Sequence, residues 1–253
     1  MKLLLTLFLS LLISVAVIAQ VKKQELPAVK PAFQQYIQIV VVTTQDWDKT
    51  TGTATLFDRK DTKSKWKRDG ENFPVVVGRS GLAWGDHLKP HAAANKIKQE
   101  GDGTAPAGAF PLTAAFGTST KPEALELPYI KLVENTECVD DPKSSFYNRI
   151  VNRMQVGNFD WKSSEKMFAV GETYALGIFV GYNSYPVEAG RGSCIFLHIW
   201  QDASTATDGG TAMERRNVER IAAWASPNKN PYLVQLTKDD YKKYQKSWKL
   251  PKL

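Results

Sequence analysis

The sequence contains few of the residues on which disulfide-rich scaffolds and metal centres depend. Of its 253 residues only two are cysteines and three are histidines. Two cysteines are too few for a miniature scaffold built on disulfides or for a four-cysteine zinc ribbon. Hydrophobic residues make up 43% and charged residues 23% of the chain, which excludes a disordered or fibrous protein. The length fits one large domain or two small ones.

Long hydrophobic runs are absent beyond the N-terminus. Residues 3–18 are almost unbrokenly apolar and follow Lys2, but the run is short for a membrane span and residues 20–24 are polar and basic. The sequence Val-Ile-Ala ending at Ala19 resembles a signal-peptidase site. We therefore predict a signal peptide over residues 1–19 rather than a membrane-spanning or buried helix. No cysteine follows the run, so a bacterial lipid anchor is excluded, and the mature protein is expected to be exported and soluble.

Positive charge exceeds negative charge, with 33 Lys and Arg against 26 Asp and Glu. Much of the excess lies in residues 237–253, which we expect to form a basic C-terminal tail. A solvated surface is the default interpretation of such a charge run, and an acidic polymer or a membrane surface is the next. Nucleic acid is not an expected partner, because the predicted export and the lack of a recognisable reader motif argue against it.

Short β-branched segments dominate the remaining pattern, and no repeat or strand–helix alternation interrupts them. The segments expected to be strands are 36–44, 53–58, 73–78, 127–133, 174–182, 193–200 and 232–236. Residues 20–35 are expected to be a linker, 100–112 a structured loop rich in glycine and proline, and Asp69-Gly70 a turn. Helical spacing is limited to 144–154 and to 213–225, which Pro227 ends.

The fold class expected from this pattern is mainly β, a curved or sandwich-like mixed sheet with a few peripheral helices, over residues 36–236.

The first two histidines have the spacing of a metal-binding pair but lack the rest of such a site. His87 and His91 follow Asp86 at the i, i+4 spacing that binds zinc on a helix. Pro90 lies inside this motif, and no third ligand accompanies it. We therefore predict neither a metal site nor a cofactor.

The third histidine has a more informative context. His198 lies on a strand of otherwise apolar residues, as a satisfied core histidine or a rigidly held base would. A polar stretch and the turn at Gly209-Gly210 follow, leading into the predicted helix at Met213. A glycine turn that opens a helix directs N–H groups and the positive dipole end at a ligand. That arrangement lowers a thiol pKa and holds an oxyanion.

The order of these segments resembles the catalytic domain of the L,D-transpeptidases. It consists of FLHIW at 196–200, a short loop and TDGGTAM at 207–213. The runs at 75–85 (VVVGRSGLAWG), 101–112 (GDGTAPAGAFPL) and 138–151 (CVDDPKSSFYNRIV) are similar to segments of the same family. The resemblance covers roughly residues 36 to 236. It implies an L,D-transpeptidase-like fold, a place in the bacterial periplasm or cell envelope, and peptidoglycan stem peptides as substrates.

The resemblance also implies roles for four residues. His198 falls on the catalytic base, Gly209 on the motif glycine, and Thr211 just after the nucleophile, where a backbone N–H helps to bind the oxyanion. The nucleophilic cysteine falls on Gly210, which has no side chain, so an acyl-enzyme at this position is excluded. The expected function is therefore a catalytically inactive domain that binds stem peptides or an envelope partner.

Two alternatives stay open. One is an active enzyme, in which Gly210 is an introduced change or Thr211, Thr207, Ser204 or Cys194 substitutes for the thiol. Cys194 shares a strand face with His198 but is about 13 Å away at roughly 3.3 Å per residue. We expect it to form a disulfide with Cys138, or both to be buried free thiols. The other alternative is a structural scaffold with His198 as a plain core residue.

Overall fold

The computed structural model describes residues 35–85 and 97–253. The predicted signal peptide, nearly all of the expected linker and the pair His87 and His91 lie outside these ranges. No helix within the described ranges is both long and apolar enough to cross a membrane.

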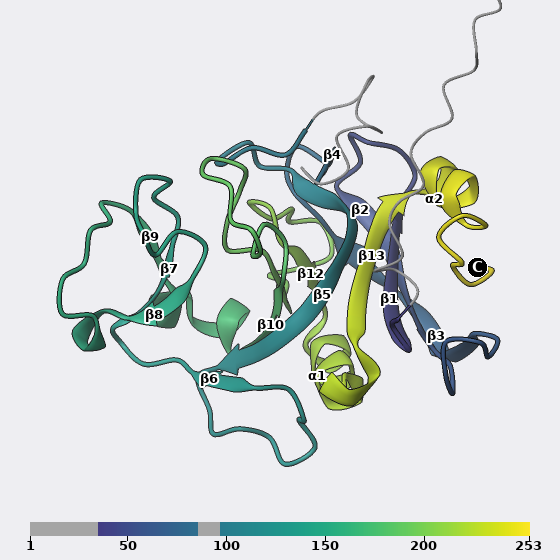
Figure 1. The fold of residues 1–253 in the computed structure, drawn as a ribbon, viewed down its shortest axis with the longest axis horizontal. Helices are drawn as coiled ribbons and strands as arrows, with labels where there is room; N and C mark the ends of the chain where they lie inside the picture. Colours follow the sequence, from purple (N-terminus) through teal and green to yellow (C-terminus); the bar gives the residue numbers. More distant parts are fainter. Residues whose placement is uncertain (1–34, 86–96) are drawn as a thin grey trace, which may run out of the picture.

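A single mixed sheet closes on itself and forms the centre of the molecule (Figure 1). Its strands are β1 Gln38–Thr44, β2 Thr51–Asp58, β3 Lys67–Val76, β4 Leu82–Trp84, β5 Ala105–Gly117, β6 Tyr129–Lys131, β10 Leu176–Val180, β11 Phe196–Ile199, β12 Thr211–Met213 and β13 Pro231–Thr237. Eight of them run in the order β10-β11-β12-β3-β2-β1-β13-β5, and β10 pairs with β5 to complete the ring. The pairs β1–β13 and β11–β12 are parallel, whereas β1–β2 and β13–β5 are antiparallel. The expected mainly β, mixed and curved sheet is confirmed, and its curvature is complete enough to close a barrel.

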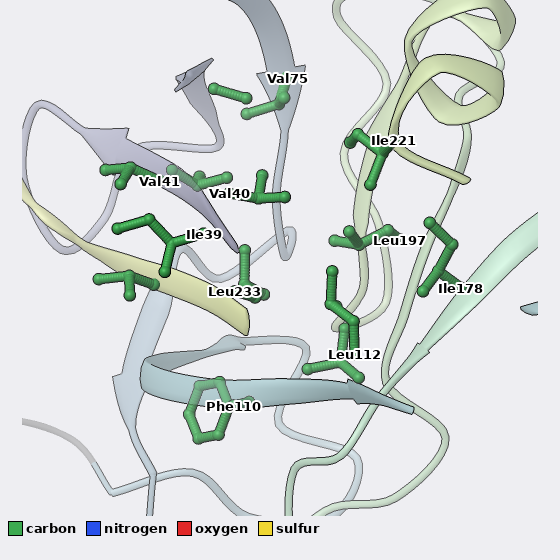
Figure 2. Close-up of a cluster of buried hydrophobic side chains, with 14 of the residues drawn as sticks. Ile39, Val40, Val41, Val75, Phe110, Leu112, Ile178, Leu197, Ile221 and Leu233 are labelled. Atoms are coloured by element: carbon green, nitrogen blue, oxygen red, sulfur yellow. The ribbon is translucent and has the colours of Figure 1, made fainter. Parts of the chain in front are cut away.

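The barrel is held together by apolar side chains from strands that are distant in sequence. All seven residues of β1 are buried, as expected for a β-branched run with both faces covered. Figure 2 shows Ile39, Phe110, Leu197 and Leu233 in one cluster with residues of neighbouring strands. The helix α1 (Arg215–Trp224) adds Ile221 to the same core, which confirms the predicted helix over this segment.

A smaller three-stranded sheet lies at one end of the long axis of the molecule (Figure 1). It consists of β7 Thr136–Val139, β8 Ile150–Asn152 and β9 Ser164–Lys166, with the short 3-10 helices η3 Arg153–Gln155 and η4 Met167–Tyr174 beside it. The helix predicted over 144–154 is therefore wrong. Asn148 has a φ of +61° and its side chain bonds the carbonyls of Tyr182 and Asn183, so the segment turns instead of winding.

The loop predicted over 100–112 is also wrong, because most of it belongs to the long strand β5. Its two prolines have no N–H to donate, but their carbonyl oxygens still accept hydrogen bonds. The Pro106 carbonyl accepts from Gln235 Nε2 at 3.0 Å, and the Pro111 carbonyl from the Gly181 N–H at 2.7 Å. The composition resembled a loop, whereas pairing on both sides stabilises the strand.

The expected turn at Asp69-Gly70 lies inside β3. The β2–β3 register shifts there, since Ala54 pairs with Phe73 but Leu56 with Asp69. Gly70 takes a φ of +58° within this bulge. The connection between the two strands lies earlier, at residues 59–66.

The basic C-terminal segment packs onto the barrel instead of forming the expected tail. It contains α2 (Lys238–Tyr244), whose N-terminus is capped by the Thr237 side chain accepting from the Asp240 N–H. Tyr241, Tyr244 and Trp248 are buried in the main core. The expected boundary at residue 237 therefore does not separate this segment from the fold, although its lysines remain exposed.

Candidate functional site

His198, Gly209 and Gly210 line one cleft of about 620 Å³ between the barrel and the smaller sheet. His198 comes from β11, and the two glycines form the turn before β12. The cleft is also lined by Glu165 from β9 and by Tyr174 from the end of η4. The cleft thus brings together residues that are far apart in the sequence.

The imidazole of His198 is held in one tautomer. Its Nδ1 lies 3.0 Å from the carbonyl oxygen of Ile199, and a ring nitrogen beside a carbonyl must carry the proton to form a hydrogen bond. Nδ1–H therefore donates, which leaves Nε2 as an acceptor. Burial lowers the pKa of His198 to about 4, so the ring is neutral at neutral pH. The ring of Tyr174 packs edge-on against it, with centroids 5.5 Å apart.

The free nitrogen of His198 faces position 210. A Cβ built on Gly210 would lie 2.9 Å from His198 Nε2 and 2.9 Å from the Phe196 carbonyl oxygen. A side chain at this position would thus meet the acceptor nitrogen directly, and glycine leaves the position without a reactive group. Both contacts are closer than real Cβ atoms make, so any larger residue requires a shift of the His198 ring and of the backbone at Phe196.

The turn that contains these glycines does not open a helix, contrary to the sequence-based expectation. It leads into β12, where Ala212 pairs with His198 in the parallel ladder, and α1 begins only at Arg215. A helix dipole therefore does not act at Gly210. The turn itself is unusual, because Gly209 takes a φ of +144° that L-residues with a side chain rarely adopt.

Thr211 does not line the cleft. Its Oγ1 donates to Gln235 Oε1 at 2.7 Å inside the barrel, and the residue pairs with Leu197 in the ladder. The side chain is 1% exposed. Thr211 is therefore excluded as a source of a nucleophilic hydroxyl.

The other candidate nucleophiles are occupied as well. Cys194 forms a disulfide with Cys138, which confirms the predicted pairing and removes the thiol. The Thr207 hydroxyl donates to the Gly210 carbonyl at 2.7 Å and accepts from the Gly209 N–H. The Ser204 hydroxyl donates to Asp202 Oδ1 at 2.6 Å. Each group has a structural partner in place of a base.

A group of acidic residues that lines the same cleft as His198 was not predicted from the sequence. Burial raises the pKa of Glu165 to about 7, helped by the negative charges of Asp140 and Glu100. The Tyr174 hydroxyl donates to Glu165 Oε2 at 2.9 Å, so Tyr174 touches both this carboxyl group and the ring of His198. Glu165 and Tyr174 lie on the consecutive elements β9 and η4, but no local sequence pattern connects them with His198.

Metal binding finds no support among the described residues. Residues 35–85 and 97–253 contain no group of three or more His, Cys, Asp or Glu side chains that could hold a metal ion. His87 and His91 lie outside these ranges.

Comparison with known proteins adds no identification. The chain matches no model of a protein family, no curated protein and no solved structure. Its function must therefore be inferred from the cleft itself.

Proposed function

We propose that the chain is an exported, L,D-transpeptidase-like protein of the bacterial cell envelope that binds peptidoglycan stem peptides in the His198 cleft without forming a covalent intermediate. The observation that carries the proposal is the geometry at Gly210. His198 Nε2 is an acceptor lying 2.9 Å from the Cβ that residue 210 lacks. The acceptor nitrogen faces the backbone position to which the resemblance assigns the nucleophile, and glycine leaves that position without one.

The size and polarity of the cleft suit a peptide ligand. Its volume of about 620 Å³ accommodates several residues of a branched peptide. Carboxylates and cations both line it, including Glu165 and Lys166 from β9 and Arg79 from the barrel. A zwitterionic peptide with free carboxylates and an amine is complementary to such a mixed surface.

An active enzyme with a substitute nucleophile is the second candidate, and the contacts of the hydroxyl groups disfavour it. Thr207, Ser204 and Cys194 are all engaged with other groups. An active form with cysteine at position 210 requires the His198 ring and the Phe196 carbonyl to move, because the added Cβ would lie 2.9 Å from each of them. A pure scaffold role is the third candidate and predicts no ligand at all.

Mass spectrometry of the protein incubated with tetrapeptide stems and a D-amino acid separates the three candidates. The proteins to compare are the natural chain, a Gly210→Cys variant, and a Gly210→Ala control that adds the Cβ without a thiol. We expect exchange or trimming of the terminal residue with Gly210→Cys only, and its loss when His198→Gln is added. The natural chain should also form no covalent adduct with a β-lactam, whereas its His198 NMR signals should shift with the stem peptide.

The outcomes discriminate clearly. Turnover by the natural chain overturns the inactive assignment and requires a nucleophile elsewhere in the cleft. If Gly210→Cys folds but is silent, and no stem peptide shifts His198, the scaffold role is favoured. Thermal melting of all variants checks that the close Cβ contact has not unfolded them.

A further inference from the structure

Two lysine-rich segments that are distant in sequence meet at one edge of the barrel. The first is the connection between β2 and β3, and the second is the C-terminal segment from α2 onward. Trp66 Nε1 in the first segment donates to the Lys249 carbonyl in the second at 2.9 Å, and the guanidinium of Arg59 lies 4.3 Å from the centre of the Trp66 ring. We call this surface the lysine edge. Its exposed lysines are Lys60, Lys63, Lys65, Lys67, Lys238, Lys242, Lys243, Lys246, Lys249 and Lys252.

The lysine edge is mounted on a fixed frame. Tyr241, Tyr244 and Trp248 are buried beneath it, and the rings of Tyr244 and Trp248 stack with centroids 5.1 Å apart. Tyr241 Oη and Gln245 Nε2 both donate to the Pro251 carbonyl, at 2.9 and 2.7 Å. The charges therefore hold defined positions instead of being carried on a loose tail.

Positive charge at this edge is largely uncompensated. Residues 58–67 and 238–253 carry the ten lysines against four aspartates, Asp58, Asp61, Asp239 and Asp240. Lys249 has a further interaction within the fold, and none of the other nine lysines forms an ion pair with another residue of the described ranges. Two described lysines outside the edge do form ion pairs, Lys98 with Asp102 and Lys166 with Glu137. A concentration of unpaired cations creates a field that attracts an anionic surface.

We propose that the lysine edge docks the protein on an anionic lipid bilayer. Lysine ammonium groups are point charges suited to a diffuse layer of headgroups, whereas recognition of single phosphates favours arginine forks. A polymer chain is usually held in a groove, and neither the His198 cleft nor two smaller clefts of the barrel include a residue of the lysine edge. A broad surface without a groove fits a bilayer better.

The mode of docking is peripheral. Of the large hydrophobic side chains exposed in the described ranges, only Leu253 belongs to this edge, so attraction to headgroups, rather than insertion, holds the protein. Figure 1 shows α2 and the turn after β2 at the opposite end of the long axis from β7, β8 and β9. The cleft borders β9, so docking at the lysine edge leaves it open.

Vesicle co-sedimentation with the purified full chain tests the proposal. The probes are vesicles of phosphatidylcholine alone and of phosphatidylcholine mixed equally with phosphatidylglycerol, each at low and high salt. Two triple variants divide the edge: Lys60→Gln, Lys63→Gln, Lys65→Gln in the turn, and Lys242→Gln, Lys243→Gln, Lys246→Gln in the C-terminal segment. The matched control, Lys121→Gln, Lys131→Gln, Lys143→Gln, removes the same charge from exposed positions elsewhere.

We expect salt-sensitive binding to the anionic vesicles only. Each triple variant should lower the partition coefficient by up to roughly 100-fold, at roughly fivefold for each lysine removed near a charged membrane. The control should bind like the natural chain. Equal losses in the control and the edge variants, equal binding to neutral vesicles, or no binding at all would overturn the proposal. Tighter binding to soluble polyphosphate than to vesicles would overturn it in favour of a polymer partner.

Discussion

Stability should depend on pH through His198, because this histidine is neutral and buried in the folded protein. Its pKa is lowered from 6.5 to about 4 by burial. The unfolded chain therefore binds the proton more readily than the folded chain, and the folded state loses stability as the pH falls from 6.5 toward 4. The size of the shift corresponds to about 3 kcal/mol at 1.36 kcal/mol per pKa unit, all of it present above pH 6.5.

Other groups titrate in the same range, so the effect must be isolated by a variant. Glu165 acts in the opposite direction, since its raised pKa of about 7 makes the folded state bind a proton more readily as the pH falls. Urea unfolding measures the loss of unfolding free energy between pH 7 and pH 4, for the natural chain and for His198→Gln. The difference between the two losses is the contribution of His198. The natural chain should lose more stability on acidification than the variant, by up to about 3 kcal/mol.

NMR titration measures the same quantity directly. With three histidines in the chain, the His198 ring signals are assigned by their loss in His198→Gln. The midpoint should lie near pH 4, well below that of an exposed histidine. A midpoint at or above 6.5 would refute both the burial argument and the neutral acceptor role of Nε2.

The remaining predictions concern the disulfide and the C-terminal segment. The Cys138–Cys194 bond spans 56 residues. Its removal by Cys138→Ser with Cys194→Ser should lower the free energy of unfolding by roughly 4 kcal/mol in the chain-entropy model. Urea unfolding checks this, and an unchanged midpoint would contradict it. Trp248→Ala should cost about 3–5 kcal/mol because the side chain is buried in the main core. If the segment were a solvated tail, thermal melting would show no difference from Lys252→Ala, an exposed neighbour.

The local hydrophobic pattern was sufficient to predict most barrel strands. The β-branched run ending at Thr44 and the alternating run around His198 became β1 and β11, because their side chains alone determine which faces are buried. Strand β5 was missed because its glycines and prolines are typical of loops, and its strand conformation depends on pairing with β13 and β10. The sequence of β5 alone therefore does not predict its strand conformation.

The candidate site was predicted only where a local motif carried it. His198 and Gly210 are brought together in the cleft, as the motif order implied, but their catalytic roles stay a prediction. Glu165 and Tyr174 could not have been found, since their relation to His198 arises from the packing of the smaller sheet against the barrel. The helical spacing of residues 144–154 was misleading because distant parts of the chain determine this segment. The Asn148 side chain forms hydrogen bonds with the backbone of Tyr182 and Cys194, and these bonds hold the segment in a turn.

The parallel pairing of the first and last barrel strands has a consequence for the order in which the chain can fold. Gln38 lies opposite Pro231 and Thr44 opposite Thr237, so β1 keeps one open edge until β13 has been synthesised. Contacts of such large sequence separation form slowly, because the chain loses the entropy of closing a long loop before the pairing can stabilise it. A nascent chain therefore remains incompletely folded until its last strand emerges, and truncation before β13 should leave β1 as an exposed, aggregation-prone edge.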